Sequence, residues 1–278
     1  MKNICTTQKE VHISGIGIHS GKHVDLRLRT SSLGKIVFRR SDLGNLEIPL
    51  DWRKIEAKNN ISLVYKGYKI QTLEHLLAVL YILGINSLIV EVEGDEIPIM
   101  DGSASPLVQS ILKAGVEVLP QRKKSIKILK PFNIQEREAS VSFFPDTEFR
   151  ITYFIEFDHP AINRQERSFH VDLENFIKEI APARTFGFLK DVPNLRAQGL
   201  ALGGSFENAV VLDEKGVING PLRFPDEFVR HKILDFIGDL SLTGHLLIGH
   251  FKAHKAGHNL HLKAVHFLLK NPEFWSFV

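Results

Sequence analysis

A segment near the carboxyl end, residues 224–242, is predicted to form a helix with a histidine and two carboxylates on one face. His231, Asp235 and Asp239 recur every four residues, while most other positions are apolar. An imidazole nitrogen and a carboxylate oxygen one helical turn apart converge on the same point, as metal ligands on a helix do. Two ligands make a poor site, because a catalytic zinc usually has three protein ligands and keeps a fourth position for water.

A second predicted helix, residues 72–83, offers the missing groups. Glu74 and His75 lie one turn into a segment that is otherwise mostly Leu, Ala, Val and Ile. A buried and unpaired glutamate would cost several kcal/mol there, and a metal-bound water facing the carboxylate would offset that cost. Adjacent helical residues diverge by about 100°, so the pair divides naturally into a ligand, His75, and a base, Glu74.

Both pairs also have a plain structural interpretation. A histidine and an aspartate on a helix form an ordinary ion pair, which Arg230 or Lys232 would complete, and Glu-His dipeptides are common. Spacing alone therefore leaves a metal site and an ion pair as open alternatives.

The tail HFKAHKAGHNLH contains His250, His254, His258 and His261. A step of four residues could indicate a helical metal face, but two glycines break that helix and the preceding segment alternates like a strand. We expect His250 and His254 on the surface. His258 falls between a predicted strand and the last predicted helix, a typical place for a catalytic group.

Composition bounds the protein class. The chain has 278 residues, 44% hydrophobic and 24% charged, which suits one large globular domain or two ordinary ones. A net charge of +3 is too weak to predict nucleic-acid binding and suits a small anionic substrate equally well. Cys5 is the single cysteine, so no internal disulfide is expected. Without a signal-like segment or a long apolar run, we expect a cytoplasmic protein with no stable membrane insertion.

The predicted elements follow a similar order in two halves of the chain: strands, a helix, a strand and a helix. Strands fill most of the first sixty residues and resume at residue 126. Thr72 and Asp226 are the expected N-caps, and Gly84 and Gly115 the expected helix stops. The other predicted elements are helices over 106–115, 171–181 and 259–271, and strands over 87–94 and 245–253.

A charged run, residues 121–125, separates the halves, and we expect domains over residues 1–122 and 126–278. Residues from about 183 to 220 interrupt the second domain and are rich in Gly, Phe and Leu. A long insertion in a compact domain is usually functional.

Several motifs then coincide along the chain: TLEHLLAVL, EIPIMDGSASP, ARTFGF, LGGSFENAVV, EFVRHKILDFIGDL and KAGHNL. Together they resemble the zinc-dependent UDP-3-O-acyl-N-acetylglucosamine deacetylases, the enzymes of the committed step of lipid A synthesis. The resemblance runs from about residue 15 to about residue 270. It implies an α+β fold of two similar domains, each with two helices packed on β-sheet, and an active site between them.

Carried over residue by residue, the resemblance implies roles for the candidate site residues. His75, His231 and Asp235 match the ligands of the Zn²⁺ cofactor. Glu74 matches the general base and His258 the general acid.

Further matches surround these positions. Thr185 matches a threonine that hydrogen-bonds the oxyanion, and Lys232 and Asp239 match residues beside the metal and the acid. Lys255 matches a lysine that contacts the nucleotide diphosphate, and Phe157 is a candidate for stacking on uracil. The insertion matches a passage for the acyl chain, with an expected lining of Phe186, Phe188, Val192, Ala201, Gly204 and Ser205.

The implied reaction is hydrolysis of the N-acetyl group of UDP-3-O-(3-hydroxyacyl)-N-acetylglucosamine, which releases acetate. We expect a monomer with this small-molecule partner and no nucleic-acid partner, and iron could replace zinc. Two alternatives remain. One is a metal-independent acid–base enzyme such as a dehydratase, and the other is a nucleotide-sugar binding module whose His/Asp face is a buried polar network. Residues 59–70 match the family only loosely, so no roles are assigned there.

Overall fold

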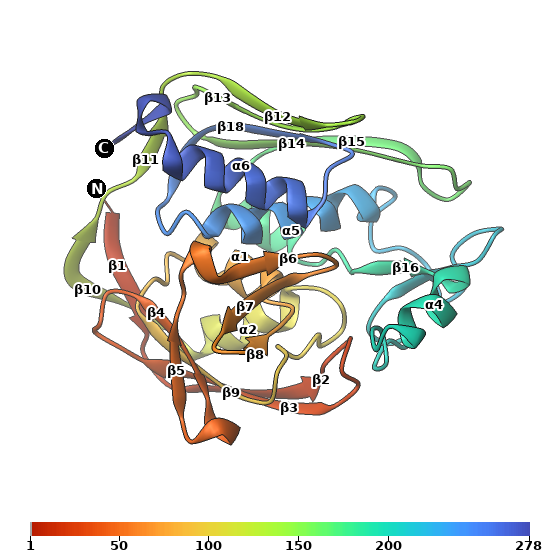
Figure 1. Ribbon diagram of the computed structural model, residues 1–278, viewed down its shortest axis with the longest axis horizontal. Helices are drawn as coiled ribbons and strands as arrows, with labels where there is room; N and C mark the ends of the chain where they lie inside the picture. Colours follow the sequence, from red (N-terminus) through yellow and green to blue (C-terminus); the bar gives the residue numbers. More distant parts are fainter. Residues whose placement is uncertain (1) are drawn as a thin grey trace.

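The computed structural model describes residues 2–278 and has helices packed between two β-sheets (Figure 1). Helices of the first half lie against one sheet, helices of the second half against the other, and the two helical layers meet in the middle. This confirms the expected α+β fold of two similar halves. The helices between the sheets are α1 (Glu74–Ile82), α2 (Ser105–Ala114), α5 (Glu227–Ser241) and α6 (His258–Lys270).

The two sheets repeat one pairing pattern. Strand β9 pairs antiparallel with β3 and parallel with β4, and β18 pairs antiparallel with β13 and parallel with β14. A parallel pair needs a crossover connection, and α1 and α5 belong to those two crossovers. The first sheet has the order β2 (Val11–Ile16), β3 (His23–Thr30), β9 (Leu88–Glu93), β4 (Ile36–Arg40) and β5 (Leu46–Pro49).

The second sheet belongs wholly to the second half. It has the order β12 (Phe132–Glu136), β13 (Ala139–Phe144), β18 (Leu247–His254), β11 (Ile126–Ile128) and β19 (Trp275–Phe277). Two further strands, β14 (Phe149–Phe157) and β15 (Asn163–His170), join it through the β14–β18 pair.

Smaller elements complete the chain. Two-stranded pairs are formed by β1 (Lys2–Thr7) with β10 (Val116–Lys123) and by β16 (Phe186–Phe188) with β17 (Val210–Leu212). A three-stranded sheet contains β6 (Ile55–Ala57), β7 (Ile61–Tyr65) and β8 (Tyr68–Ile70). Helix α4 (Val192–Ala197) is short, as are 3₁₀ turns at Ser41–Leu43, Trp52–Lys54, Leu189–Asp191 and Pro272–Phe274. Within residues 2–278, every helix is too short or too polar to cross a bilayer.

Helices α1 and α5 form the centre of the molecule. In α1 the residues from Glu74 to Leu80 are buried, and in α5 every residue except Lys232 is buried. A helix covered on all sides belongs in a core. The ionisable side chains on these two helices must therefore find partners within the protein, because unpaired burial is costly.

Of the two predicted N-caps, Asp226 is confirmed in position and Thr72 is wrong. Leu73, not Thr72, occupies the N-cap position of α1, and the Thr72 hydroxyl donates to the Glu96 carboxylate instead (3.0 Å). Thr72 has a φ of 60°, outside the extended region that an N-cap normally adopts. Asp226 is the N-cap residue of α5, but its carboxylate is engaged by Arg230 (2.7 Å) and by a second arginine.

The predicted helix stops are confirmed. Gly84 and Gly115 follow α1 and α2 with φ of 70° and 83°, a region that favours glycine. The helix expected over residues 171–181 forms as α3 (Leu173–Asn175), which continues into a π-helical turn, Phe176–Ile180.

The domain boundary stays a prediction, and the structure adds one detail to it. Residues 121–123 belong to β10, the last strand of the first half, which pairs with β1, its first strand. The insertion lies at one end of the molecule, where Figure 1 labels β16 and α4. Its backbone rests on the turn between β2 and β3, since Leu202 N donates to His19 O (3.1 Å).

A completely buried carboxylate, Glu96, ties this turn to the start of α1. It accepts hydrogen bonds from the backbone amides of His19 and Ser20, both at 2.8 Å, and from the Thr72 hydroxyl at 3.0 Å. The β2–β3 turn, which supports the insertion, and Thr72, which lies two residues before Glu74, are therefore hydrogen-bonded to the same carboxylate.

Replacing Glu96 by alanine leaves three donors without their acceptor in a buried place. We expect Glu96→Ala to lower the free energy of unfolding by about 2–4 kcal/mol, measured by urea denaturation. The exposed Glu93 supplies the control, and Glu93→Ala should change stability by less than about 0.5 kcal/mol. Equal losses in both variants would contradict the role given to Glu96.

Candidate metal centre and active site

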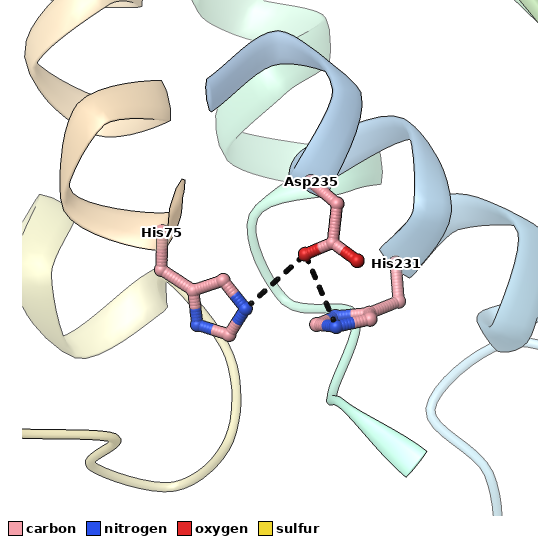
Figure 2. Close-up of side chains that lie close together, drawn as sticks. All are labelled: His75, His231 and Asp235. Atoms are coloured by element: carbon pink, nitrogen blue, oxygen red, sulfur yellow. Dashed lines mark ion pairs between the residues drawn. The ribbon is translucent and has the colours of Figure 1, made fainter. Parts of the chain in front are cut away.

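Three side chains from the two central helices meet in the core. Asp235 Oδ1 lies 3.5 Å from His75 Nε2 and 3.5 Å from His231 Nε2. Figure 2 shows His75 reaching from α1 toward the carboxylate, with His231 below it on α5. All three residues are buried, and their ligand atoms lie within 4.8 Å of one another.

This spacing fits a tetrahedral ion. Zinc–nitrogen and zinc–oxygen bonds of about 2.1 Å at tetrahedral angles separate the ligand atoms by roughly 3.4 Å, close to the two 3.5 Å distances. Two imidazoles and one carboxylate are also a donor set that catalytic zinc uses. The residues therefore fit a metal centre with three protein ligands.

Hydrogen bonds hold the α5 ligands in the protonation state that binding needs. The Nδ1 of His231 faces the Ala183 carbonyl at 3.1 Å, so Nδ1 carries the proton and Nε2 keeps its lone pair. Burial lowers the pKa of His231 to about 4, against the opposing charge of Asp235. The imidazole is thus neutral at pH 7.

Asp235, the candidate carboxylate ligand, is ionised. Lys232 Nζ donates to Asp235 Oδ2 at 2.9 Å, which leaves Oδ1 facing the histidines. Burial alone would raise the pKa of Asp235, but the charge of Lys232 holds it well below its usual value.

Glu74 stands beside this group as the first residue of α1. Its Oε2 accepts a hydrogen bond from the Ile61 amide at 3.0 Å, and its Oε1 lies 4.0 Å from His258 Nε2. Burial raises the pKa of Glu74, opposed most by the charge of His258. A carboxylate with raised proton affinity is a better general base near neutral pH.

His258 opens α6 and is held by a buried aspartate. Its Nδ1 lies 2.8 Å from Asp239 Oδ2, and the same oxygen lies 2.7 Å from His261 Nδ1. Burial by itself would lower the pKa of His258, but the charge and hydrogen bond of Asp239, helped by Glu74, raise it to about 9. The Nε2 atom, which points toward Glu74 and Asp235, therefore carries a proton at pH 7.

Asp239, His258 and His261 also lie close enough to be considered as metal ligands. Here both nitrogens approach one oxygen at hydrogen-bond distance, whereas ligands around one zinc ion lie roughly 3.4 Å apart. This trio is therefore a hydrogen-bonded network. Tyr153 extends it, since its hydroxyl lies 3.0 Å from His261 Nε2.

Some of these contacts had no role in the sequence prediction. His261 follows His258 by three residues on one helix, so helical spacing could have indicated it. The Ile61 amide and the Ala183 carbonyl left no signal, because any residue type supplies a backbone group. His250 was expected in a strand and lies in β18.

The aromatic residues of the insertion reach the edge of the centre. The Phe186 ring lies 6.3 Å from the His231 ring and 5.8 Å from Lys232 Nζ. Phe157 packs against both Phe186 and Phe188, with ring centroids 5.8 Å apart in each case. Phe157 is thus a neighbour of the insertion.

Thr185 and Lys255 belong to different parts of the second half. Thr185 is half-buried and follows Ala183, whose carbonyl holds His231, by two residues. Lys255 follows β18, and its ammonium group pairs with Glu156 at 2.5 Å.

The remaining predicted lining residues belong to the insertion. Val192 starts α4, and the Ala201 amide lies 3.4 Å from His19 Nδ1. Gly204 N donates to Ala201 O at 3.4 Å, and Ser205 N donates to an asparagine side chain at 2.8 Å. These four residues thus belong to one stretch of chain that follows Phe186.

A cavity of about 650 Å³ opens beside His258. Lys58, Glu136 and Arg137 also line it, together with the first residues of α6. The cavity thus reaches the start of α6, next to His258.

Comparisons with known proteins agree on one family. The family model described as UDP-3-O-acyl N-acetylglycosamine deacetylase matches residues 5–270. Relatives named UDP-3-O-acyl-N-acetylglucosamine deacetylase are similar over 98% of the chain. The relative from Citrifermentans bemidjiense is 45% identical with 91% of its length covered, that from Syntrophotalea carbinolica 44% with 90%, and that from Haemophilus influenzae 42% with 92%.

The raised pKa of His258 makes the stability of the metal-free protein depend on pH. The proton that His258 retains on folding stabilises the native state fully below pH 6.5, and this contribution is lost as pH rises to about 9. His231 and His261 have lowered pKa values, so their contributions to the pH dependence of stability fall below pH 6.5. We expect a loss of about 3 kcal/mol across it.

Asp239→Asn removes the charge that holds this proton. Urea unfolding of metal-free protein between pH 6.5 and 9 should show a steep decline in the wild type and a nearly flat profile in the variant. Parallel profiles would mean that Asp239 does not set the proton affinity of His258.

Proposed function

The chain belongs to the UDP-3-O-acyl N-acetylglycosamine deacetylase family, and we propose that it removes the N-acetyl group of UDP-3-O-(3-hydroxyacyl)-N-acetylglucosamine with the help of zinc. Acetate and a free glucosamine amine are the products, and lipid A synthesis is the purpose. The observation that carries this proposal is the trio of buried ligand atoms around one point, with a carboxylate base and a protonated histidine beside it.

His75, His231 and Asp235 would hold the ion. Zinc held there would supply Lewis acidity toward the acetamide carbonyl and would lower the pKa of the attacking water from about 15.7 toward 7.

Glu74 takes a proton from the attacking water. Its Oε2 is fixed by the Ile61 amide, so Oε1, on the side of His258, is free to accept. Because burial raises the pKa of this carboxyl group, it binds the proton more readily than an exposed glutamate would.

The Thr185 hydroxyl donates to the carbonyl oxygen as negative charge develops on it. One such donor is worth about 3–4 kcal/mol in other hydrolases. Lys232 contributes a nearby positive charge while it holds Asp235 in place.

His258 completes the reaction. The bond between the carbonyl carbon and the nitrogen breaks, its electrons go to nitrogen, and His258 Nε2 gives that nitrogen its proton. Asp239 keeps the imidazole oriented through Nδ1 and keeps it protonated. An amine is too basic to leave without this proton.

The substrate is long, and its parts would bind on different elements. Lys255, with Lys58 and Arg137 at the cavity, suits the diphosphate, and Phe157 offers a ring for uracil. The acyl chain would follow the insertion from Phe186 past Phe188 and Val192 toward Ala201, Gly204 and Ser205. A monomeric state, a cytoplasmic location and the domain limits at residues 122 and 126 stay predictions.

Acetate release from UDP-3-O-acyl-N-acetylglucosamine tests the function. We expect turnover by the zinc-loaded chain, loss of turnover after chelation, and recovery when zinc is restored. Turnover that chelation leaves unchanged would favour the metal-independent enzyme, and binding without turnover by folded, metal-loaded protein would favour the binding module.

Glu74→Gln separates the base from the ligands. The variant should retain its bound zinc, measured by atomic absorption, while kcat falls by about 10²–10⁴-fold. Glu93→Gln, on the exposed face of β9, is the matched control and should leave both quantities unchanged. Loss of zinc from Glu74→Gln would make Glu74 a ligand and leave the base unassigned.

A further inference from the structure

Gly238 lies where α5 touches the beginning of α1. It follows Asp235 by three residues and His231 by seven, so it shares the face of α5 that carries both ligands. A Cβ atom at this position would lie 2.2 Å from the Glu74 carbonyl oxygen, 2.8 Å from the carbonyl carbon and 2.9 Å from Cα. All three atoms belong to the backbone of Glu74, the proposed base, and its carbonyl group is bonded to the nitrogen of His75, a proposed ligand.

Any side chain at Gly238 would force the two helices apart. Real Cβ atoms essentially never approach another heavy atom within 3.0 Å, and the obstacle is backbone, so no change of rotamer removes the clash. Glycine is a poor residue for the interior of a helix, yet it occupies this position in α5 (Glu227–Ser241). Packing against α1 is the physical reason for a glycine here.

We propose that Gly238 is a positioning residue that sets the distance between His75 on α1 and the ligand pair on α5. The inference rests on the proposed function, because it concerns the same ligands. His231 and Asp235 share one helix and keep their 3.5 Å separation whatever α1 does. The 3.5 Å between His75 Nε2 and Asp235 Oδ1 spans both helices, so it depends on their approach.

The displacement is large for such a site. The contact between residue 238 and the Glu74 oxygen would have to grow from 2.2 Å to at least 3.0 Å. Metal sites tolerate deviations of about 0.2 Å in ligand distance, and a misplacement of about 1 Å costs roughly 100-fold in rate. His75 and Glu74 would move together, whereas the substrate contacts on the insertion and after β18 belong to other elements.

Gly238→Ala tests this role against Gly249→Ala. A Cβ at Gly249, in β18, would also clash, at 2.7 Å from Ile128 Cγ1 and 3.0 Å from the Phe144 oxygen, but away from the ligands. For both variants, Zn²⁺ affinity is measured by competition with a chromophoric chelator, and thermal unfolding is measured on the metal-free protein. Kinetics of acetate release give kcat and KM.

We expect Gly238→Ala to weaken Zn²⁺ binding by at least about 10-fold and to lower kcat by about 100-fold, with KM within about threefold of the wild type. Gly249→Ala should lower the unfolding temperature and keep Zn²⁺ affinity and kcat. Unchanged Zn²⁺ affinity in Gly238→Ala would overturn the proposal, as would an equal loss in Gly249→Ala.

A chain that does not fold is also informative. Gly238→Ala would then be repeated with Lys66→Gly, which relieves an exposed turn residue at a φ of 51°. If Gly238→Ala fails to fold both alone and with Lys66→Gly, the close approach of the helices is needed for folding itself, and the positioning role is overturned. A wild-type chain without Zn²⁺ affinity would contradict the proposed function, and this inference with it.

Discussion

The packing of α1 against α5 is the constraint on which the candidate site depends, because each helix carries part of it. Glu74 and His75 come from the first half of the chain, and His231 and Asp235 from the second. Both helices are covered on nearly all sides, so their relative position is fixed by the core of the protein. Rigid elements hold reacting groups more accurately than loops do.

Burial of many ionisable groups around these helices is tolerated because each carboxylate has a cation or histidine nitrogens beside it. Asp235 lies between Lys232 and two histidines, and Asp239 lies between His258 and another histidine. An unpaired buried charge would be far more costly. The same neighbours determine the chemistry: His231 is neutral and suited to a metal, whereas His258 is charged and suited to donate a proton. Environments that push pKa values apart are the physical basis of separate acid and base roles.

The repeated sheet pattern explains why these helices face each other. Each half forms a parallel strand pair whose crossover contains a helix, β4 to β9 through α1 and β14 to β18 through α5. The helix covers one face of its sheet, and the two covered faces then pack together (Figure 1). The family to which the chain belongs, and the two-half fold expected from resemblance, agree with this arrangement.

Features that depend on local periodicity could be predicted from the sequence. The four-residue step between His231 and Asp235 already implied that their side chains converge, and the 100° turn between Glu74 and His75 implied that these two side chains point in different directions. Helix and strand order, the stops at Gly84 and Gly115, and the family followed from pattern and motif as well. Contacts between elements were decided by the tertiary structure alone. Three such contacts depend on distances between separate elements. They are the hydrogen bond from Thr72 to the buried Glu96, the hydrogen bond from the Ile61 amide to Glu74, and the close approach of Gly238 to the backbone of Glu74. Periodicity fixes the direction of a side chain within one helix, but only packing fixes how closely two helices approach.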